Sequence, residues 1–168
     1  FLTRTLPYVK FFGSNLAFAF YGLICLTGII LLFLKFGEFI NGFSFFFNLE
    51  GFIDYSFAIF IVKVIHEFSH AYTAKRYGVY VPSMGIALIV LWPVLYTDVT
   101  DGWKLQNRRH RLYISAAGVL SESVIAGICT IGWALTQPGV LNNIFFIIAS
   151  VTWVSTLAVN LNPAIRFD

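Results

Sequence analysis

The sequence predicts an all-α polytopic membrane protein with about four transmembrane helices and a short re-entrant or extended, β-like segment between the second and third. Three observations support this prediction. Apolar residues make up 58% of the 168 residues and charged residues 11%, whereas a soluble domain carries about a quarter charged residues. Four apolar stretches approach the roughly 20 residues that a spanning helix needs. Basic residues cluster beside these stretches, as is typical of cytoplasmic loops.

The expected spans are residues 16–34, 55–77, 112–135 and 144–161. The first and the fourth contain no charged residue. The second is apolar at its start but carries Lys63, His66, Glu67 and His70, and the third contains Glu122. Ionisable side chains inside a membrane are costly and usually serve a function, so the second span is where we expect a site.

The segment between the second and third spans is too short to cross a bilayer. Its apolar centre, residues 86–96, is about half a span long and is interrupted by Pro93. β-Branched residues and the breaks at Pro82 and Gly85 favour extended chain over helix. The backbone of such a segment must be covered by protein or line a wet cavity.

The expected organisation has two parts. Residues 1–54 form an N-terminal segment with the first transmembrane helix and an external loop, and residues 55–168 form the transmembrane core. The sequence starts at Phe1 and not at a Met, and it stops at Asp168 within a motif. We therefore expect a piece of a longer chain, truncated at its C-terminus. The two cysteines lie in apolar runs and predict neither a disulfide framework nor a cysteine metal site.

The distribution of Lys and Arg predicts the orientation. Lys75 and Arg76 lie at the end of the second span, and residues 104–111 carry four basic side chains just before the third. The loop after the third span, residues 136–143, has no charge. The positive-inside rule therefore places residues 75–111 and both chain ends in the cytoplasm. We interpret the basic cluster as a cytoplasmic loop and expect no nucleic-acid partner.

A metal-binding pattern lies in the second span, as His66-Glu67-Phe68-Ser69-His70. Residues four apart share a helix face, so His66 and His70 can present two imidazoles to one metal. Glu67 lies beside them and could take a proton from a metal-bound water. The plainer interpretation is a pair of buried, hydrogen-bonded histidines. The cost of ionisable groups in a bilayer favours the metal site.

A third ligand is needed, because catalytic zinc sites usually have three protein ligands and a water. His110 lies in the basic loop, where we expect it to be solvated. The third ligand is then expected to be a carboxylate. The candidates are Asp54, Asp98, Asp101, Glu122 and Asp168. Zinc is the expected cofactor, although iron, cobalt and nickel also suit imidazole and carboxylate ligands.

Two further segments extend the pattern. Residues 160–168 read Asn-Leu-Asn-Pro-Ala-Ile-Arg-Phe-Asp, and residues 116–122 read Ala-Ala-Gly-Val-Leu-Ser-Glu. With residues 66–70 they resemble the site-2 protease family of intramembrane zinc metalloproteases. The family has Asn-Pro-x-Pro, four residues including a Leu, and Asp-Gly in the first of these segments. Asn160 and Asp168 match in register.

The match has departures. Pro163 fits the family pattern, but Leu161 replaces its first Pro and Phe167 replaces its Leu. In the family's Ala-Gly-Pro-x-x-Asn, Val119 stands for Pro and Glu122 for Asn. Residues 92–98 are similar to a bacterial branch of peptide zinc metalloproteases.

This resemblance implies residue roles and a location. Asp168 would be the third zinc ligand beside His66 and His70, Glu67 the general base, and Asn160 a group that binds substrate or the developing oxyanion. The substrate would be a membrane-embedded or membrane-associated peptide or transmembrane helix. The setting would be the lipid bilayer of the bacterial cytoplasmic membrane, with the N-terminus and the active site towards the cytoplasm.

Competing interpretations remain at this point. A metal- or proton-coupled transporter, or a peptide-export component without protease activity, would also use ionisable groups inside the membrane. Glu67 discriminates, since hydrolysis needs a base there and transport does not. A catalytically dead scaffold is a third interpretation. The extended segment 84–91 could hold a substrate by strand pairing or form a buried plug.

Two intramembrane charges have no role in the resemblance. We hypothesise that Lys63 and Glu122 form a structural pair, because each alone in lipid would cost roughly 2.5–3.5 kcal/mol. Alternatively, Lys63 snorkels outward, or Glu122 is protonated and bonded to a backbone carbonyl.

Overall fold

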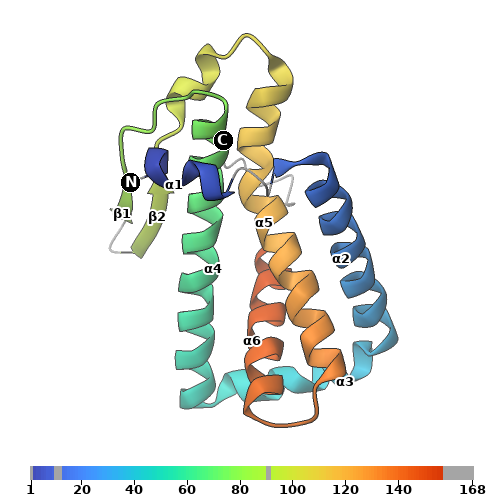
Figure 1. Cartoon of the computed structure of the whole chain (residues 1–168). Helices are drawn as coiled ribbons and strands as arrows, with labels where there is room; N and C mark the ends of the chain where they lie inside the picture. The colour runs from blue at the N-terminus through green and yellow to red at the C-terminus, as the bar shows by residue number, and fades with distance from the viewer. Residues whose placement is uncertain (1, 10–12, 90–91, 157–168) are drawn as a thin grey trace. The chain divides into compact units, whose positions relative to one another are not determined.

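The computed structural model describes residues 2–9, 13–89 and 92–156, and these are mostly helical (Figure 1). The helices are α1 (Leu2–Val9), α2 (Asn15–Leu34), α3 (Phe36–Gly42), α4 (Leu49–Arg76), α5 (Arg108–Leu135) and α6 (Val140–Ser155), with 3₁₀ turns η2 (Phe43–Phe47) and η3 (Thr100–Lys104). The strands are β1 (Met84–Ile89) and β2 (Trp92–Thr97). Asn160, Asp168 and the end of the expected fourth span lie outside the described residues.

The chain divides into two compact units. The first contains Phe1–Phe18 and Lys63–Ser121, and the second contains Ala19–Val62 and Glu122–Asp168. The helices α2, α4 and α5 each pass from one unit into the other, at residues 18–19, 62–63 and 121–122. The metal-binding pattern falls in the first unit, and the two units are described separately below.

Two of the described helices, α2 and α5, are long and apolar enough to cross a membrane. They correspond to the first and third expected spans. Most of α2 is exposed, and the side chains on its surface include large apolar ones such as Leu16, Leu23 and Phe33. A surface of this kind suits lipid contact. Two candidate membrane helices and a small sheet are therefore what the structure supports of the expected four-span fold.

The second unit has a core of aromatic side chains at one end of its helices. Phe39 of α3 packs edge-to-face on Trp133 and Phe146, with ring centroids 5.6 Å and 5.3 Å apart. We expected the stretch before residue 55 to be an external loop, but it contains α3, η2 and the start of α4. In this stretch Phe39 and Phe43 pack in the aromatic core, whereas Phe36, Phe46 and Phe47 remain exposed.

A close helix crossing also lies in the second unit. A Cβ added to Gly28 of α2 would lie 2.7 Å from the Cα of Gly127 of α5. Real Cβ atoms do not approach so closely, so glycine at this crossing is what lets the two backbones meet.

The first unit contains the β-hairpin that we expected as an extended segment. Helix α4 ends at Arg76, and the positive φ of 77° at Gly78 allows the N–H of Val79 to reach the carbonyl oxygen of Ala74 at 3.0 Å. The chain then forms β1 and β2, which pair antiparallel with Met84 opposite Thr97 and Ile86 opposite Leu95. The expectation of extended chain is confirmed.

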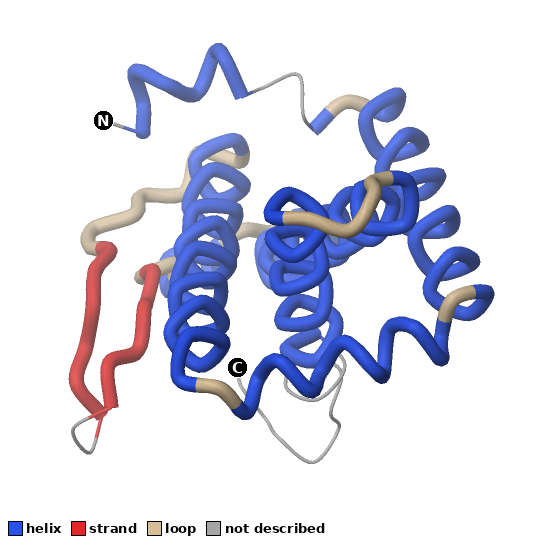
Figure 2. The backbone as a smooth tube through the Cα atoms, turned by 90° about the horizontal axis from the view of Figure 1, so that it is seen from below, coloured by secondary structure: helices blue, strands red, loops and turns tan. Residues whose placement is uncertain are grey.

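The hairpin lies alongside α4, as Figure 2 shows. Thr97 at the end of β2 donates a hydrogen bond from Oγ1 to the backbone carbonyl oxygen of Glu67, at 3.1 Å. The short helix α1 also attaches to α4, where the hydroxyls of Thr5 and Tyr72 share a hydrogen bond of 2.8 Å. Both contacts hold partners of α4 close to the metal-binding pattern.

Candidate metal and catalytic site

The structure brings the imidazoles of His66 and His70 together on one face of α4. Their Nε2 atoms lie 3.1 Å apart and their ring centroids 4.8 Å apart. Two nitrogen ligands about 2.0–2.1 Å from a tetrahedral zinc lie about 3.3–3.4 Å from one another. The observed separation is within a few tenths of an ångström of that value, so this pair fits a shared metal ion.

The other ring nitrogen of His70 is oriented by α5. Its Nδ1 lies 2.7 Å from the carbonyl oxygen of Ile114. A carbonyl oxygen can only accept, so Nδ1 carries the proton and donates it, and Nε2 of a neutral His70 keeps its lone pair. Metal-binding histidines typically make such a bond, because it fixes the tautomer and the orientation of the ring.

The imidazole of His66 lies directly on the backbone of α5 at Gly118. A Cβ added there would lie 2.3 Å from Nε2 of His66 and 2.4 Å from its Cε1. Any side chain at this position would therefore displace the ring from its place beside His70. Gly118 supplies the room in which the two nitrogen atoms meet.

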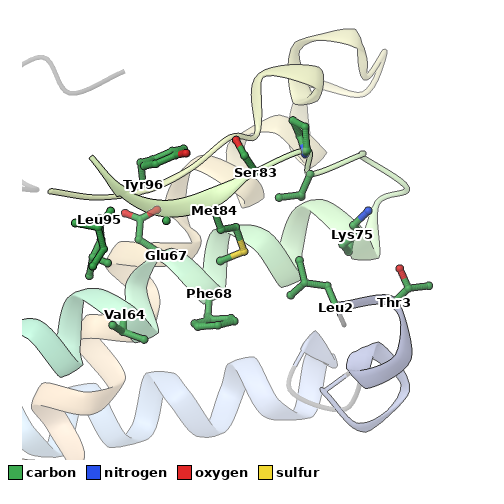
Figure 3. Close-up of a pocket in the computed structure, with 14 residues that line it drawn as sticks. Leu2, Thr3, Val64, Glu67, Phe68, Lys75, Ser83, Met84, Leu95 and Tyr96 are labelled. Carbon is green, nitrogen blue, oxygen red and sulfur yellow. The ribbon is translucent and has the colours of Figure 1, made fainter. Parts of the chain in front are cut away.

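Glu67 projects from α4 into a cavity of about 510 Å³. The cavity lies between α4 and the hairpin, and its lining includes Met84 and Leu95 (Figure 3). Figure 3 shows the carboxylate of Glu67 directed towards Leu95 and Tyr96 of β2. The carboxylate thus follows His66 by one residue and faces a space that a substrate could enter.

The third metal ligand stays a prediction. Within residues 2–9, 13–89 and 92–156, no group of three His, Cys, Asp or Glu side chains gathers. Asp98 accepts the backbone N–H of Thr100 at 3.0 Å, and this bond lowers the pKa of its carboxyl. Asp101 pairs with Lys104. Asp168, implied by the resemblance, lies outside the described residues.

The remaining histidine is placed by stacking. The ring of His110 lies on that of Tyr77, with centroids 4.1 Å apart and an interplanar angle of 15°. Tyr77 lies just beyond the end of α4 and His110 in the first turn of α5. This contact ties the two helix ends together and gives His110 a structural role in the basic loop.

Glu122 is fully buried in the second unit. Its Oε2 accepts a hydrogen bond from Oγ1 of Thr156 at 3.0 Å and lies 3.5 Å from Oγ of Ser155. Sequence reasoning missed these hydroxyl partners, which follow Glu122 by more than thirty residues. The proposed contact between Lys63 and Glu122 stays a prediction.

Sequence reasoning also missed the contributions of Ile114 and Gly118. The run of small residues Ala116-Ala117-Gly118 was the available signal, because small residues mark places where helices approach closely. It could have predicted a close neighbour of α5, although not that the neighbour is an imidazole.

A protein-family model matches the part of the chain that contains these site residues. The model of peptidase family M50 matches residues 54–167, which include nearly all of α4, the hairpin, α5 and α6. The chain belongs to peptidase family M50. This is the site-2 protease family, whose members are membrane-embedded metallopeptidases and in general depend on zinc. No curated protein and no solved structure matches the chain.

Proposed function

We propose that this M50 peptidase is an intramembrane zinc endopeptidase that hydrolyses peptide bonds of membrane-embedded or membrane-associated substrates. One observation carries the proposal: the Nε2 atoms of His66 and His70 lie 3.1 Å apart, with His70 oriented by the carbonyl oxygen of Ile114. Membership of M50 supports the metallopeptidase class.

Zinc would be held by His66 and His70, with Asp168 as the third ligand that the resemblance implies. A zinc ion bound there supplies a Lewis acid and a water whose pKa falls to about 7. Glu67 is the general base: a carboxylate oxygen takes a proton from the attacking water and later gives it to the leaving amine. Asn160 would bind the substrate or the developing oxyanion.

The hairpin supports a role in holding the substrate. A helical substrate hides its peptide bonds, so it must unwind before hydrolysis. In the two-stranded sheet, one edge of β1 pairs with β2. The other edge of β1 pairs with an extended substrate segment in this proposal. This edge borders the cavity that Glu67 faces, since Met84 and Ile86 of β1 line that cavity.

The topology belongs to the same proposal. Four spans are made by α2, α4, α5 and the segment that begins with α6, and the basic residues 75–111 lie in the cytoplasm. His70 is five residues before Lys75, or about 8 Å along the helix. Cytoplasmic water is therefore within reach of the site. The bacterial cytoplasmic membrane is the setting that we propose.

The deciding experiment replaces Glu67 by Gln. The amide keeps the size of the side chain but cannot take a proton, so proteolysis of a membrane peptide should fall by at least a hundredfold, as expected for loss of a general base. Zinc content, measured by elemental analysis, should not change. Wild-type cleavage by Glu67→Gln would contradict the mechanism. Zinc-dependent movement of a peptide across vesicles without cleavage would favour the transport function instead.

A further inference from the structure

Most residues that line the cavity beside Glu67 are apolar, a property that zinc hydrolysis does not require, and Thr3, Lys75 and Ser83 are the other polar lining residues. Val64 and Phe68 of α4 form one wall, and Met84, Ile86 and Leu95 of the hairpin form the other. Figure 3 shows the side chains of Phe68 and Met84 next to one another, with Glu67 beside them on the same lining. A reactive carboxylate and an apolar pocket thus share one cavity.

The register of the hairpin places three of the residues that line this cavity on one face of the sheet. Side chains alternate between the two faces of a strand, so Met84 and Ile86 share a face, and their cross-strand partners Thr97 and Leu95 lie on the same face. Thr97 donates to the backbone carbonyl of Glu67, so this face is turned towards α4. Gly85 and Tyr96, which alternate with these residues along the strands, also line the cavity.

The wall is incompletely covered. Ile86 lines the cavity and yet remains 58% exposed. An apolar side chain entering beside it would remove apolar surface of both partners from water, which is favourable. The volume of about 510 Å³ lies within the range of specific ligand pockets and exceeds that of a single large side chain.

We propose that this cavity is a specificity subsite that takes a bulky apolar side chain, such as Leu, Met or Phe, from the substrate residue beside the scissile bond. The inference rests on the proposed function, because Glu67 marks where the bond would be hydrolysed. Phe68, Met84 and Ile86 are the residues that determine the preference. The substrate class is a peptide with a large apolar residue at the cleavage position.

The first test measures kcat/KM for peptides that carry Ala, Leu or Phe on either side of the scissile bond. A hydrophobic pocket discriminates about 10- to 200-fold for one methylene, so Leu should exceed Ala by at least tenfold at one of the two positions. Met84→Trp should narrow the cavity and reduce this preference. Leu88→Trp is the matched control, since Leu88 points to the same face of β1 but lies outside the cavity and is 72% exposed.

The second test does not depend on turnover. Met84 is the single methionine of the sequence, so a ¹³C-methyl methionine label reports on this cavity alone, apart from any initiator residue. In the Glu67→Gln variant, a Leu-containing peptide should shift the Met84 methyl resonance, and the matched Ala peptide should leave it in place at the same concentration.

The outcomes separate the two proposals. Cleavage with equal rates for Ala and Leu at both positions, together with an unmoved Met84 signal, would overturn the subsite and leave the peptidase function standing. A Met84 shift specific to the Leu peptide, without cleavage of any peptide by the wild-type protein, would support the apolar site and overturn the hydrolytic function. If Met84→Trp fails to fold, the methyl measurement still decides.

Discussion

The Nδ1 atom of His70 lies 2.7 Å from the carbonyl oxygen of Ile114, a residue 44 positions further along the chain. This bond leaves Nε2 as the atom that faces His66. The metal-binding geometry therefore depends on α5 as well as on the pattern in α4, and the predictions below test both helices.

Zinc binding should depend on two of the three histidines. His66→Ala and His70→Ala should each reduce zinc from about one ion per chain, as expected for one three-ligand site, to background. His110→Ala should retain zinc, because that ring stacks on Tyr77. Elemental analysis of the purified proteins is the measurement. Full occupancy in both of the first two variants would exclude the proposed site.

Gly118→Ala should weaken the site without removing a ligand. The added methyl would overlap the ring of His66, and overpacking of this kind typically destabilises by about 1–3 kcal/mol. Zinc affinity should fall about 10- to 100-fold, as it does when groups that orient metal ligands are changed. Competition with a chelator measures the affinity, and thermal unfolding measures the stability.

Gly22→Ala is the control for that substitution. Gly22 lies within α2 and a Cβ there meets no atom within 4 Å. Alanine should be accepted with unchanged zinc affinity. Equal affinities for Gly118→Ala and Gly22→Ala would show that the ring of His66 does not need the space that Gly118 leaves.

The proposed topology predicts labelling from opposite sides. A cysteine placed in residues 136–143 should react with an impermeant thiol reagent added outside the cell, and one placed at Gln106 should react only after permeabilisation. Both are built on a background in which Cys25 and Cys129 are replaced by Ala. The reverse pattern would invert the orientation.

Coupling between Lys63 and Glu122 can be measured with a double-mutant cycle. If they pair, Lys63→Met and Glu122→Gln should be non-additive by about 0.5–3 kcal/mol in unfolding free energy. The cycle of Thr156→Val with Glu122→Gln serves as the positive control, because Thr156 donates to Oε2 at 3.0 Å. Additive losses in the first cycle, beside coupling in the second, would mean that Lys63 has another partner.

Local spacing predicted the parts of the fold and the site that depend on neighbours in sequence. The four-residue interval between His66 and His70 fixes a shared helix face, and the structure places the two rings together. Pro82 and Gly85 predicted extended chain, and strands follow. Helix α1 was missed, because it is eight residues long, contains Pro7, and is attached through Thr5 to a tyrosine 67 residues away.

Contacts between segments that are distant in the sequence could not be predicted from its local pattern. Nothing in the local pattern indicates that Ile114 supplies an acceptor for His70, since every residue has a backbone carbonyl. The partners proposed for Glu122 were Lys63 or a backbone carbonyl, and the structure adds the hydroxyls of Ser155 and Thr156. Pairing of this kind is decided by how helices pack, which composition and periodicity do not encode residue by residue.

The burial of Glu122 has a consequence for biosynthesis. Its hydroxyl partner Thr156 is made 34 residues later, so a nascent chain that ends with α5 presents this carboxyl to the membrane without that donor. Lone insertion would cost roughly 2.5–3.5 kcal/mol for a charged carboxylate. In the proposed topology, in which both helices cross the membrane, we expect α5 and α6 to enter the bilayer together as a hairpin. The amide of Asn142, which donates to the carbonyl oxygens of Trp133 and Thr136, closes its turn.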